Sequence, residues 1–370
     1  MTSPSDELVL KLDAHYADSA RALLWGTALG DAAGYPVELL SAQEISLRFQ
    51  NQEGSLEDQL FTGARRVSDD TQLTLYTLDA LLQVLEWTKA GSSCDELACL
   101  WLAYLRWFRA IGYQHPEQAP YQPDRPIDGF ASLRQRRGPG KATLAALSTG
   151  QLLTPQREEH RQALGSGALV RSAVFALLPL DQLTALLSLT RRAAALTHGH
   201  PDALGSACAY VLLIRAALVY RGQPSPLVRA LERVLAWMEP GQLLAQLCPP
   251  TTQRCLQQAY RLGRDDATSK SRVDRAFGKG WLAPEVLGIS VLAGIRAEQQ
   301  AGSGQPSLLA GIKAALMIDG DSDSVAAISA ALLGAAYGSA LFEPRLVESL
   351  DIYPVLDYML GAWLEQLDLA

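Results

Sequence analysis

The sequence predicts an all-α fold: an orthogonal multi-helix bundle, built as a single domain around one central buried helix. Apolar residues recur at helical spacing through almost the whole chain of 370 residues, of which 48% are hydrophobic. No alternating run of β-branched residues is long enough to indicate a strand. The stretch Val325–Phe342 carries no charge and is rich in Ala, Gly and Ser. Such small residues favour a helix packed on all sides by other helices over a membrane span.

The expected helices follow from this periodicity. The first, Leu23–Ala33, belongs to a stretch with Gly26, Gly30 and Gly34 spaced four apart, a stripe that lets another helix approach closely. The other expected helices, in chain order, are Asp70–Leu85, Asp95–Phe108, Lys141–Leu147, Ala168–Leu178, Asp181–Leu196, Ala203–Tyr220, Leu227–Met238, Thr252–Leu262, Pro284–Gln299, Ser307–Met317, Ser324–Ala340 and Tyr353–Leu367.

Two connections between these helices are long. Gln114–Gly138 is Pro-rich and polar, and Gly263–Gly280 is charged and contains turn residues. A loop as long as the first is usually functional or mobile in a compact domain. No change of composition marks a domain boundary, so we expect one domain over residues 1–370, with residues 1–20 as an acidic N-terminal extension.

Composition limits the partners and the compartment. The net charge of −7 provides no basic field for nucleic acid or for anionic membranes. The N-terminus has no basic region followed by a long apolar run, so no signal peptide is expected. The five cysteines are an odd number without paired metal-ligand spacing. We therefore expect reduced, mostly buried thiols in a cytoplasmic protein.

Two short acid-rich clusters stand at the starts of expected helices: Ser68–Thr71 (SDDT) and Asp319–Ser324 (DGDSDS). Each sets carboxylates beside hydroxyls, the oxygen ligands that Mg²⁺ and Mn²⁺ prefer. Carboxylates two residues apart cannot share one face of a continuous helix, but a loop-to-helix junction can turn both toward one point. The sequence therefore predicts that the clusters are two halves of one metal site.

Helix capping is the competing interpretation of these clusters. Ser68 and the acids after it complement a helix N-terminus without any metal. The second cluster favours a metal, because Asp319, Asp321 and Asp323 directly precede a helix with no charge of its own. Carboxylates gathered there repel one another unless a cation neutralises them.

Seven segments, in this order along the chain, carry a resemblance to a known family. They are GTALGDAAGYPVE (26–38), SDDTQLTLYT (68–77), RGPGKATLAAL (137–147), GSGALVR (165–171), THGHPDA (197–203), FGKGWLAPEVLGISVL (277–292) and DGDSDSVAAISAALLGAAYG (319–338). Together they resemble the ADP-ribosylglycohydrolase family, of the dinitrogenase-reductase-activating glycohydrolase type. The resemblance implies an all-α fold, a binuclear centre with two Mg²⁺ or Mn²⁺ ions, and removal of ADP-ribose from modified targets.

The resemblance also implies a set of metal ligands. Glu38 matches the family's glutamate at the metal or its bound water, and Glu38 or Asp70 is the candidate for acid/base catalysis. Asp31 is expected to support the site from behind, orienting a ligand or a bound water. At the positions of Ser68 and Ser324 the family usually has threonine; serine keeps the hydroxyl but loses the methyl that stiffens χ1. The implied metal ligands are Ser68, Asp69, Asp70, Asp321, Asp323 and Ser324.

Turns and single side chains form the implied substrate side. Glycine turns let backbone N–H groups approach the oxygens of a diphosphate and a ribose. Ser166 departs from the family's usual Asn or Cys. His198 is implied to contact the bound ligand, whereas His200 is expected to be a cap or turn residue, and neither is expected to bind a metal in so oxygen-rich a site. The implied substrate-binding residues are Gly138, Gly165, Ser166, Gly167, His198 and Trp281.

The resemblance favours a hydrolase that reverses mono-ADP-ribosylation, with ADP-ribosylarginine as the expected linkage and an ADP-ribosylated protein as the partner. Three alternatives stay open. The first is another metal hydrolase, such as a phosphoesterase. The second is an immunity or regulatory protein that binds and blocks an ADP-ribosyltransferase toxin, with or without hydrolase activity. The third is a catalytically silent relative, against which the oxygen ligands at all seven proposed positions argue.

Overall fold

The computed structural model describes residues 8–51, 54–61, 65–158, 160–265 and 269–369. Helix makes up 66% of the chain and no described residue lies in a strand, which confirms the all-α prediction. The helices, with 3₁₀ helices labelled η, are α1 (Ala14–Gly34), η2 (Tyr35–Val37), α2 (Ala42–Gln50), α3 (Leu56–Leu60), α4 (Asp69–Lys89), α5 (Glu96–Ala110), η3 (Pro126–Gly129), η4 (Ala131–Arg134), α6 (Lys141–Ser148), α7 (Gly167–Val170), η5 (Arg171–Leu177), α8 (Leu183–Ala194), α9 (Pro201–Tyr220), α10 (Pro226–Trp237), α11 (Pro250–Gly263), α12 (Lys270–Phe277), α13 (Ala283–Ala301), α14 (Leu308–Leu316), α15 (Ser322–Tyr337), η6 (Ser339–Leu341), α16 (Pro344–Glu348) and α17 (Tyr353–Gln366).

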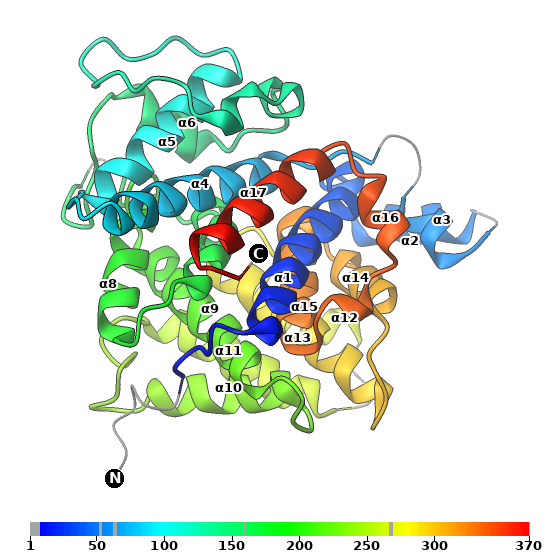
Figure 1. The fold of residues 1–370 in the computed structure, drawn as a ribbon. Helices are drawn as coiled ribbons and strands as arrows, with labels where there is room; N and C mark the ends of the chain where they lie inside the picture. Colours follow the sequence, from blue (N-terminus) through cyan, green and yellow to red (C-terminus); the bar gives the residue numbers. More distant parts are fainter. Residues whose placement is uncertain (1–7, 52–53, 62–64, 159, 266–268, 370) are drawn as a thin grey trace.

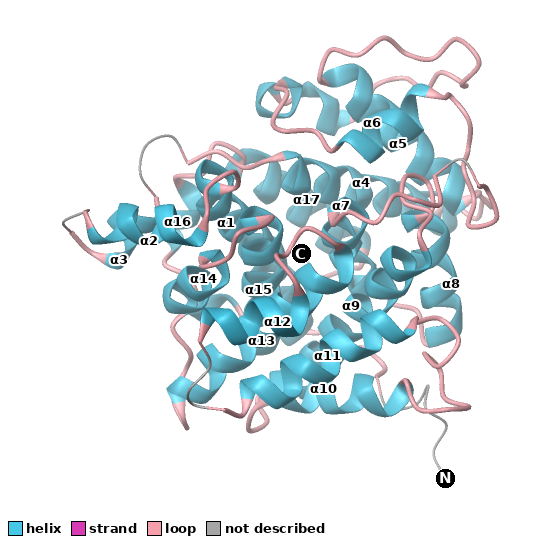
Figure 2. Ribbon diagram, turned by 180° about the vertical axis from the view of Figure 1, so that it is seen from behind, coloured by secondary structure: helices cyan, strands magenta, loops and turns pink. Residues whose placement is uncertain are grey.

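Helices α1 and α15 lie side by side at the centre of the bundle (Figure 1). From Ser322 to Ala336 every residue of α15 is buried, which confirms the expected central helix. Viewed from behind, α13 and α14 lie next to α15 (Figure 2), and both pack on it. One cluster of buried apolar side chains extends from Leu8 to Leu364 and so draws on almost the whole length of the chain.

One described helix, α9, is long and apolar enough by length and composition to cross a membrane. In its most apolar window, 83% of the residues are buried inside the protein. Helices α8, α10, α13 and α15 all pack against it. Core helices pass the same test of length and composition, and the packing around α9 is that of a core helix.

The N-terminal part of the chain is more helical than expected. Helix α1 begins at Ala14 rather than at Leu23, so the expected extension over residues 1–20 is wrong for its last seven residues. Asp13 starts the helix because its side chain accepts a hydrogen bond from the backbone N–H of Tyr16 (3.1 Å). The side chains of Tyr16 and Ala20 are buried, which places this first part of α1 in the core.

Two other differences lie in the middle and late parts of the chain. The expected helix Ala168–Leu178 is one turn of α-helix followed by the 3₁₀ helix η5. At the change the Ser172 hydroxyl donates to the Ala168 carbonyl (2.6 Å), a bond that competes with regular helix geometry. The expected connection Gly263–Gly280 contains α12, a short polar helix with an ion pair from Lys270 to Asp274 (2.7 Å); residues 266–268 of it lie outside the described residues.

The long connection Gln114–Gly138 is held against α4 and α5 by buried charges. Arg106 of α5 donates to the Asp128 carboxylate (2.6 Å) and also pairs with Asp79 of α4. Arg125, in the connection itself, donates to Asp79 (3.0 Å) and to Glu86 (3.1 Å). This ion-pair network fixes the path of the chain that leads into α6.

Candidate metal centre and substrate cleft

Helix packing brings the start of α15 next to the end of α1. A Cβ atom added to Gly26 or Gly30 would overlap the backbone of Ala330 or Ala326, and one added to Gly34 would overlap Asp323. The glycine stripe predicted to permit a close helix approach therefore contacts α15. Because Gly34 lies against Asp323, the segment that follows α1 starts next to the second acid-rich cluster.

The first acid-rich cluster forms the start of α4. Ser68 is the N-cap, and its hydroxyl accepts a hydrogen bond from the Asp70 backbone N–H (3.1 Å). The Asp31 carboxylate, from α1, accepts from the backbone N–H groups of Ser68 (2.8 Å) and Thr71 (3.1 Å) and from the Thr71 hydroxyl. Asp31 thus connects the start of α4 to α1.

The second cluster forms the start of α15, where Asp321 is the N-cap. The Asp323 carboxylate accepts from the Ser324 backbone N–H (2.9 Å). The Ser324 hydroxyl donates to the Asp70 carboxylate (2.6 Å), a contact between residues 254 positions apart. Ser166 adds a third segment, because its hydroxyl donates to the Asp321 carboxylate and lies 3.1 Å from the Ser324 hydroxyl.

The two clusters meet at one cleft. A carboxylate oxygen from each of Glu38, Asp321 and Asp323 can lie within 4.8 Å of the other two. Asp69 and Asp70 line the same cleft, which has a volume of about 560 Å³. We call these five acidic residues the carboxylate wall. A cleft of this size is typical of small-molecule sites.

The carboxylate wall holds more negative charge than its surroundings neutralise. Burial, followed by neighbouring carboxylates, raises the pKa of Asp70 and Asp323 well above the usual value. Burial raises the pKa of Glu38 to about 7, with Asp321 as the next cause. Among the described residues that line the cleft, Lys141 is the single lysine or arginine. An unneutralised group of acids such as this is stabilised by bound cations.

The donor atoms of the wall suit Mg²⁺ or Mn²⁺, which take carboxylate, hydroxyl and water oxygens. Glu38, Asp69, Asp321 and Asp323 present carboxylates to the cleft, and Asp70 and Ser324 connect the two halves. Ser68 is buried beneath the wall and is not among the residues that line the cleft. The cleft offers no cysteine among its described lining residues, so the donor set does not favour a thiolate-bound metal.

Asp319 does not join the carboxylate wall, so the sequence argument that grouped it with Asp321 and Asp323 is wrong at this position. Its carboxylate accepts from the Ala42 backbone N–H (2.9 Å) and pairs with Lys270 (2.9 Å). These two partners, the Ala42 N–H first, hold the pKa of Asp319 below its usual value. Gly320 packs so closely on the backbone of residues 279–280 that the chain turns between Asp319 and Asp321.

The rest of the cleft lining comes mainly from two segments, 138–143, which runs into the start of α6, and 165–167, which runs into the start of α7; we call these two segments the glycine wall. Gly138 has a φ of +67°, a conformation that favours glycine, and packs against Tyr35. The Gly140 backbone N–H donates to the Asp69 carboxylate (3.2 Å), and the Asp69 N–H donates to the Arg137 carbonyl (2.9 Å). The two walls are therefore connected at Asp69.

The structure places both histidines that were considered in the sequence analysis. His198 lines the cleft next to the 165–167 turn, and burial, followed by the charge of Arg171, lowers its pKa to about 3. His200 lies outside the cleft lining and caps α9, where its Nδ1 accepts from the Asp202 backbone N–H (3.1 Å). Trp281 lies at the cleft and is 42% exposed. All six residues expected to bind substrate line the same cleft.

Six of the residues that line the cleft were not among the site residues predicted from the sequence: Leu39, Pro139, Gly140, Lys141, Ala142 and Thr143. Lys141 and Thr143 follow Gly138 in the glycine wall, and Leu39 follows Glu38 at the cleft, with its side chain 85% exposed. The available signal was that Lys141 and Thr143 lie within the segment 137–147 and that Leu39 directly follows the segment 26–38. An exposed leucine and a half-exposed tryptophan give the cleft an apolar edge beside its acids.

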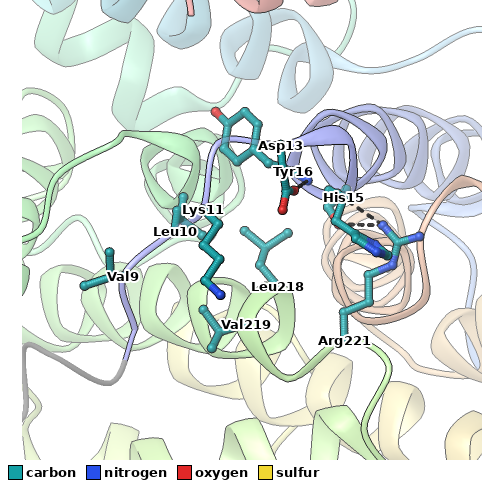
Figure 3. A pocket seen from close by; sticks show the side chains of 10 residues that line it. Val9, Leu10, Lys11, Asp13, His15, Tyr16, Leu218, Val219 and Arg221 are labelled. Atoms are coloured by element: carbon teal, nitrogen blue, oxygen red, sulfur yellow. Dashed lines mark hydrogen bonds between the residues drawn. The ribbon is translucent and has the colours of Figure 1, made fainter. Parts of the chain in front are cut away.

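A separate hollow of about 310 Å³ lies where the segment before α1 meets the end of α9 (Figure 3). Leu218 and Val219 form part of its lining. Arg221 reaches back to α1 and donates to the His15 carbonyl (3.3 Å) and the Ser19 hydroxyl (2.8 Å). None of the predicted site residues lines this hollow, so it is distinct from the cleft.

The all-α fold and the cleft lined by carboxylates from distant segments place this protein in a class of helical proteins with a candidate metal centre. A model of the family described as ADP-ribosylglycohydrolase matches residues 12–370, so the chain belongs to this family. Membership suggests glycohydrolase activity toward ADP-ribose linkages.

A solved structure described as an "ADP-ribosylglycohydrolase-related protein complex" has a chain with the same fold. The TM-score is 0.61 at 22% sequence identity, and the alignment covers 95% of this chain and 99% of that chain. No curated protein matches the sequence.

Proposed function

We propose that this protein is a metal-dependent hydrolase that removes ADP-ribose from modified protein side chains, with ADP-ribosylarginine as its preferred substrate. The observation that carries the proposal is the bond from Ser324 to Asp70 (2.6 Å), which joins the two acid-rich clusters in one carboxylate wall. Family membership supports the reaction class. The glycine wall supports a nucleotide sugar as the ligand, because glycines without side chains and the cationic Lys141 suit the close approach of a diphosphate.

The carboxylate wall would hold two Mg²⁺ or Mn²⁺ ions through Asp69, Asp70, Asp321 and Asp323, with Glu38 beside a bound water. Bound there, the ions would supply Lewis-acid activation of a water and anchor the vicinal hydroxyls of the terminal ribose. Ser324 would contribute a hydroxyl oxygen. Ser68, also predicted as a ligand, does not line the cleft; its backbone N–H donates to Asp31, which holds it at the start of α4.

Glu38 is the better placed of the two candidates for acid/base catalysis. Asp70 is buried and its carboxylate already accepts the Ser324 hydroxyl, whereas Glu38 is half-buried and stands beside the exposed Leu39. A group that moves a proton between water and a leaving group must reach both. We assign proton transfer to Glu38 and a fixed, ligand-orienting role to Asp70.

The reaction is hydrolysis at C1″ of the terminal ribose. The bond from a water oxygen to C1″ forms as the bond from C1″ to the guanidine nitrogen breaks, and one proton of the water ends on the released guanidine. Positive charge that develops at C1″ is stabilised by the nearby carboxylates. The same negative wall would favour a cationic guanidinium leaving group over a neutral serine hydroxyl, which supports the arginine preference.

The test is a substrate panel. Purified protein is incubated with ADP-ribosylarginine, ADP-ribosylserine and a nucleotide pyrophosphate, with chelator, with Mg²⁺ and with Mn²⁺, and the products are identified by mass spectrometry. We expect free ADP-ribose from the arginine conjugate, with loss of turnover in chelator and recovery on adding either metal. Cleavage of the pyrophosphate alone would indicate a phosphoesterase instead. Release of ADP-ribose that persists in chelator would contradict the metal requirement.

A further inference from the structure

Behind the cleft lies a buried arginine that the proposed reaction does not use. Arg171 is 1% exposed, and its hydrogen-bond partners among the described residues are two hydroxyls and the Ala193 carbonyl, with no carboxylate. Its Nη2 donates to the Thr197 hydroxyl (2.7 Å) and its Nε donates to the Tyr104 hydroxyl (3.1 Å). A buried guanidinium without a counter-ion is costly, so its contacts are the place to look for a role.

The direction of the bond to Thr197 is fixed by chemistry. Arginine can only donate, so the Thr197 oxygen accepts from Arg171. The other partner of this hydroxyl among the described residues is Nδ1 of His198, at 2.7 Å. Thr197 is completely buried, and a buried hydroxyl proton without an acceptor costs about 1–3 kcal/mol. The Thr197 hydroxyl therefore donates to Nδ1 of His198.

This direction determines where the imidazole carries its own proton. A nitrogen that accepts a hydrogen bond is unprotonated, so the neutral ring of His198 carries its proton on Nε2. Nε2 lies on the side of the 165–167 turn, because a Cβ atom added to Gly165 would stand 3.6 Å from it. Burial and the charge of Arg171 keep the ring neutral, with a pKa of about 3.

We propose that Arg171 and Thr197 are positioning residues that hold His198 as the neutral Nε2–H tautomer, so that it offers the cleft a hydrogen-bond donor without a charge. The matching ligand atom is an acceptor, namely a phosphate or ribose oxygen of the nucleotide sugar; this part rests on the proposed function. In this tautomer Nε2 cannot take up a proton, so His198 contributes to binding and not to base catalysis.

Nuclear magnetic resonance tests the tautomer directly. Protein labelled with ¹⁵N at its five histidines gives a pair of ring-nitrogen signals for each, and His198→Gln identifies the pair that belongs to His198. We expect a protonated Nε2 and an unprotonated Nδ1 in the unliganded protein at neutral pH. A proton on Nδ1, or on both nitrogens, would overturn the proposal.

Two substitutions at Thr197 separate the hydroxyl from the packing. Thr197→Val removes the donor to Nδ1 and is expected to give a mixture of tautomers, whereas Thr197→Ser keeps the donor and the wild-type spectrum. Calorimetry with ADP-ribose and Mg²⁺ should show binding weakened about fivefold in the valine variant, close to 1 kcal/mol. If the valine variant changes tautomer but binds ADP-ribose as tightly as the wild type, the Nε2–H does not serve the ligand.

Tyr104→Phe is the matched control. It removes the other side-chain hydrogen bond of the same guanidinium but leaves Thr197 and His198 in contact. We expect Tyr104→Phe to lose about as much stability as Thr197→Val, with no change in tautomer or in ADP-ribose affinity. If Tyr104→Phe changes the tautomer and the affinity as much as Thr197→Val does, the effect comes from general destabilisation of the region, which would contradict the proposal. The spectrum does not depend on turnover, so failure of the hydrolase assignment and failure of the tautomer assignment are seen in separate measurements.

Discussion

The carboxylate wall and the glycine wall of the cleft are held in place by different forces. Backbone-to-backbone packing of α1 on α15 positions the carboxylate wall, at three glycines where no Cβ fits. Buried ion pairs around Arg106 and Asp128 hold the segment that leads to the glycine wall. Close packing of one helix backbone on another leaves little room for movement, whereas ion pairs can be weakened one at a time. The comparison indicates rigid geometry for the ligands of a cation and a more adjustable surface for the substrate.

Removing a carboxylate should produce the largest effect on activity. Asp321→Asn or Asp69→Asn is expected to lower turnover of ADP-ribosylarginine about a thousandfold, close to 4 kcal/mol in activation free energy. The fold should survive, because the substitution relieves repulsion within the wall. Thermal unfolding with and without Mg²⁺ is the second measurement, and the stabilisation by Mg²⁺ should disappear.

Asp319→Asn is the matched control for this experiment. Asp319 lies two residues from Asp321 but pairs with Lys270 outside the cleft. Its substitution should cost no more than about 1 kcal/mol of stability, as for a partly exposed ion pair, and should leave the Mg²⁺ response intact. If the control loses the Mg²⁺ response as fully as Asp321→Asn, the boundaries of the carboxylate wall are wrong.

Breaking the close helix contact should have the largest effect on stability. Gly30→Ala forces a Cβ into the backbone of Ala326 and is expected to lower the free energy of unfolding by about 3 kcal/mol. Gly361→Ala, in α17, provides the control because nothing lies near the added Cβ, and alanine there should be neutral or stabilising by about 0.5–1 kcal/mol. Denaturant titration measures both, and equal destabilisation of the two variants would refute the packing argument.

Weakening the ion-pair network should affect substrate binding more than metal binding. Asp128→Asn removes one of the two carboxylate partners of Arg106 but keeps a polar side chain of the same shape. We expect a loss of about 2 kcal/mol of stability. We also expect a KM for ADP-ribosylarginine raised about tenfold with little change in kcat, because the glycine wall shifts. An unchanged KM would show that the ion-pair network does not position the glycine wall, and a lost response to Mg²⁺ would show that the two walls are not independent.

The smallest effect is the pH dependence of the metal-free protein. The pKa of Glu38 is raised to about 7 and that of Asp70 well above its usual value, so the folded protein holds more protons than the unfolded chain. Stability without metal should therefore fall as the pH rises from 6.5 to 8. Because the pKa of His198 is lowered from 6.5 to about 3, this residue changes the stability mainly below pH 6.5 and does not affect the comparison between pH 6.5 and 8. Melting temperatures in chelator give the measurement, and a metal-free protein that becomes more stable toward pH 8 would contradict the assignment.

Strong helical periodicity predicted the elements that matter most for the cleft. The expected helices at the positions of α4, α9 and α15 are confirmed, because long apolar runs leave few alternatives. Short polar helices were missed. Helix α2 has a capping box, Ser41 with Glu44, which was a usable signal, whereas α12 depends on an ion pair that periodicity does not detect.

The candidate site was predictable where chemistry and chain position coincide. Carboxylates and hydroxyls at two helix starts indicated that Ser68–Asp70 and Asp321–Ser324 lie together, and the structure brings them together; their roles as metal ligands stay predictions, as does the cytoplasmic location. Asp319 shows the limit of this reasoning, because one turn at Gly320 separates it from its neighbours. Segments 165–171 and 197–203 drew attention to Arg171, Thr197 and His198, but the contact from Arg171 through Thr197 depends on tertiary packing, which the sequence did not predict.

The bond from Ser324 to Asp70 also determines when the protein can become competent during its synthesis. These residues are separated by 254 positions, so the ribosome must translate 254 further codons after Asp70 before the second half of the site is complete. At bacterial to eukaryotic elongation rates this delay is about 13–50 s. A nascent chain released before Ser324 would carry Asp69 and Asp70 without their counterpart, so premature termination yields no partially active product.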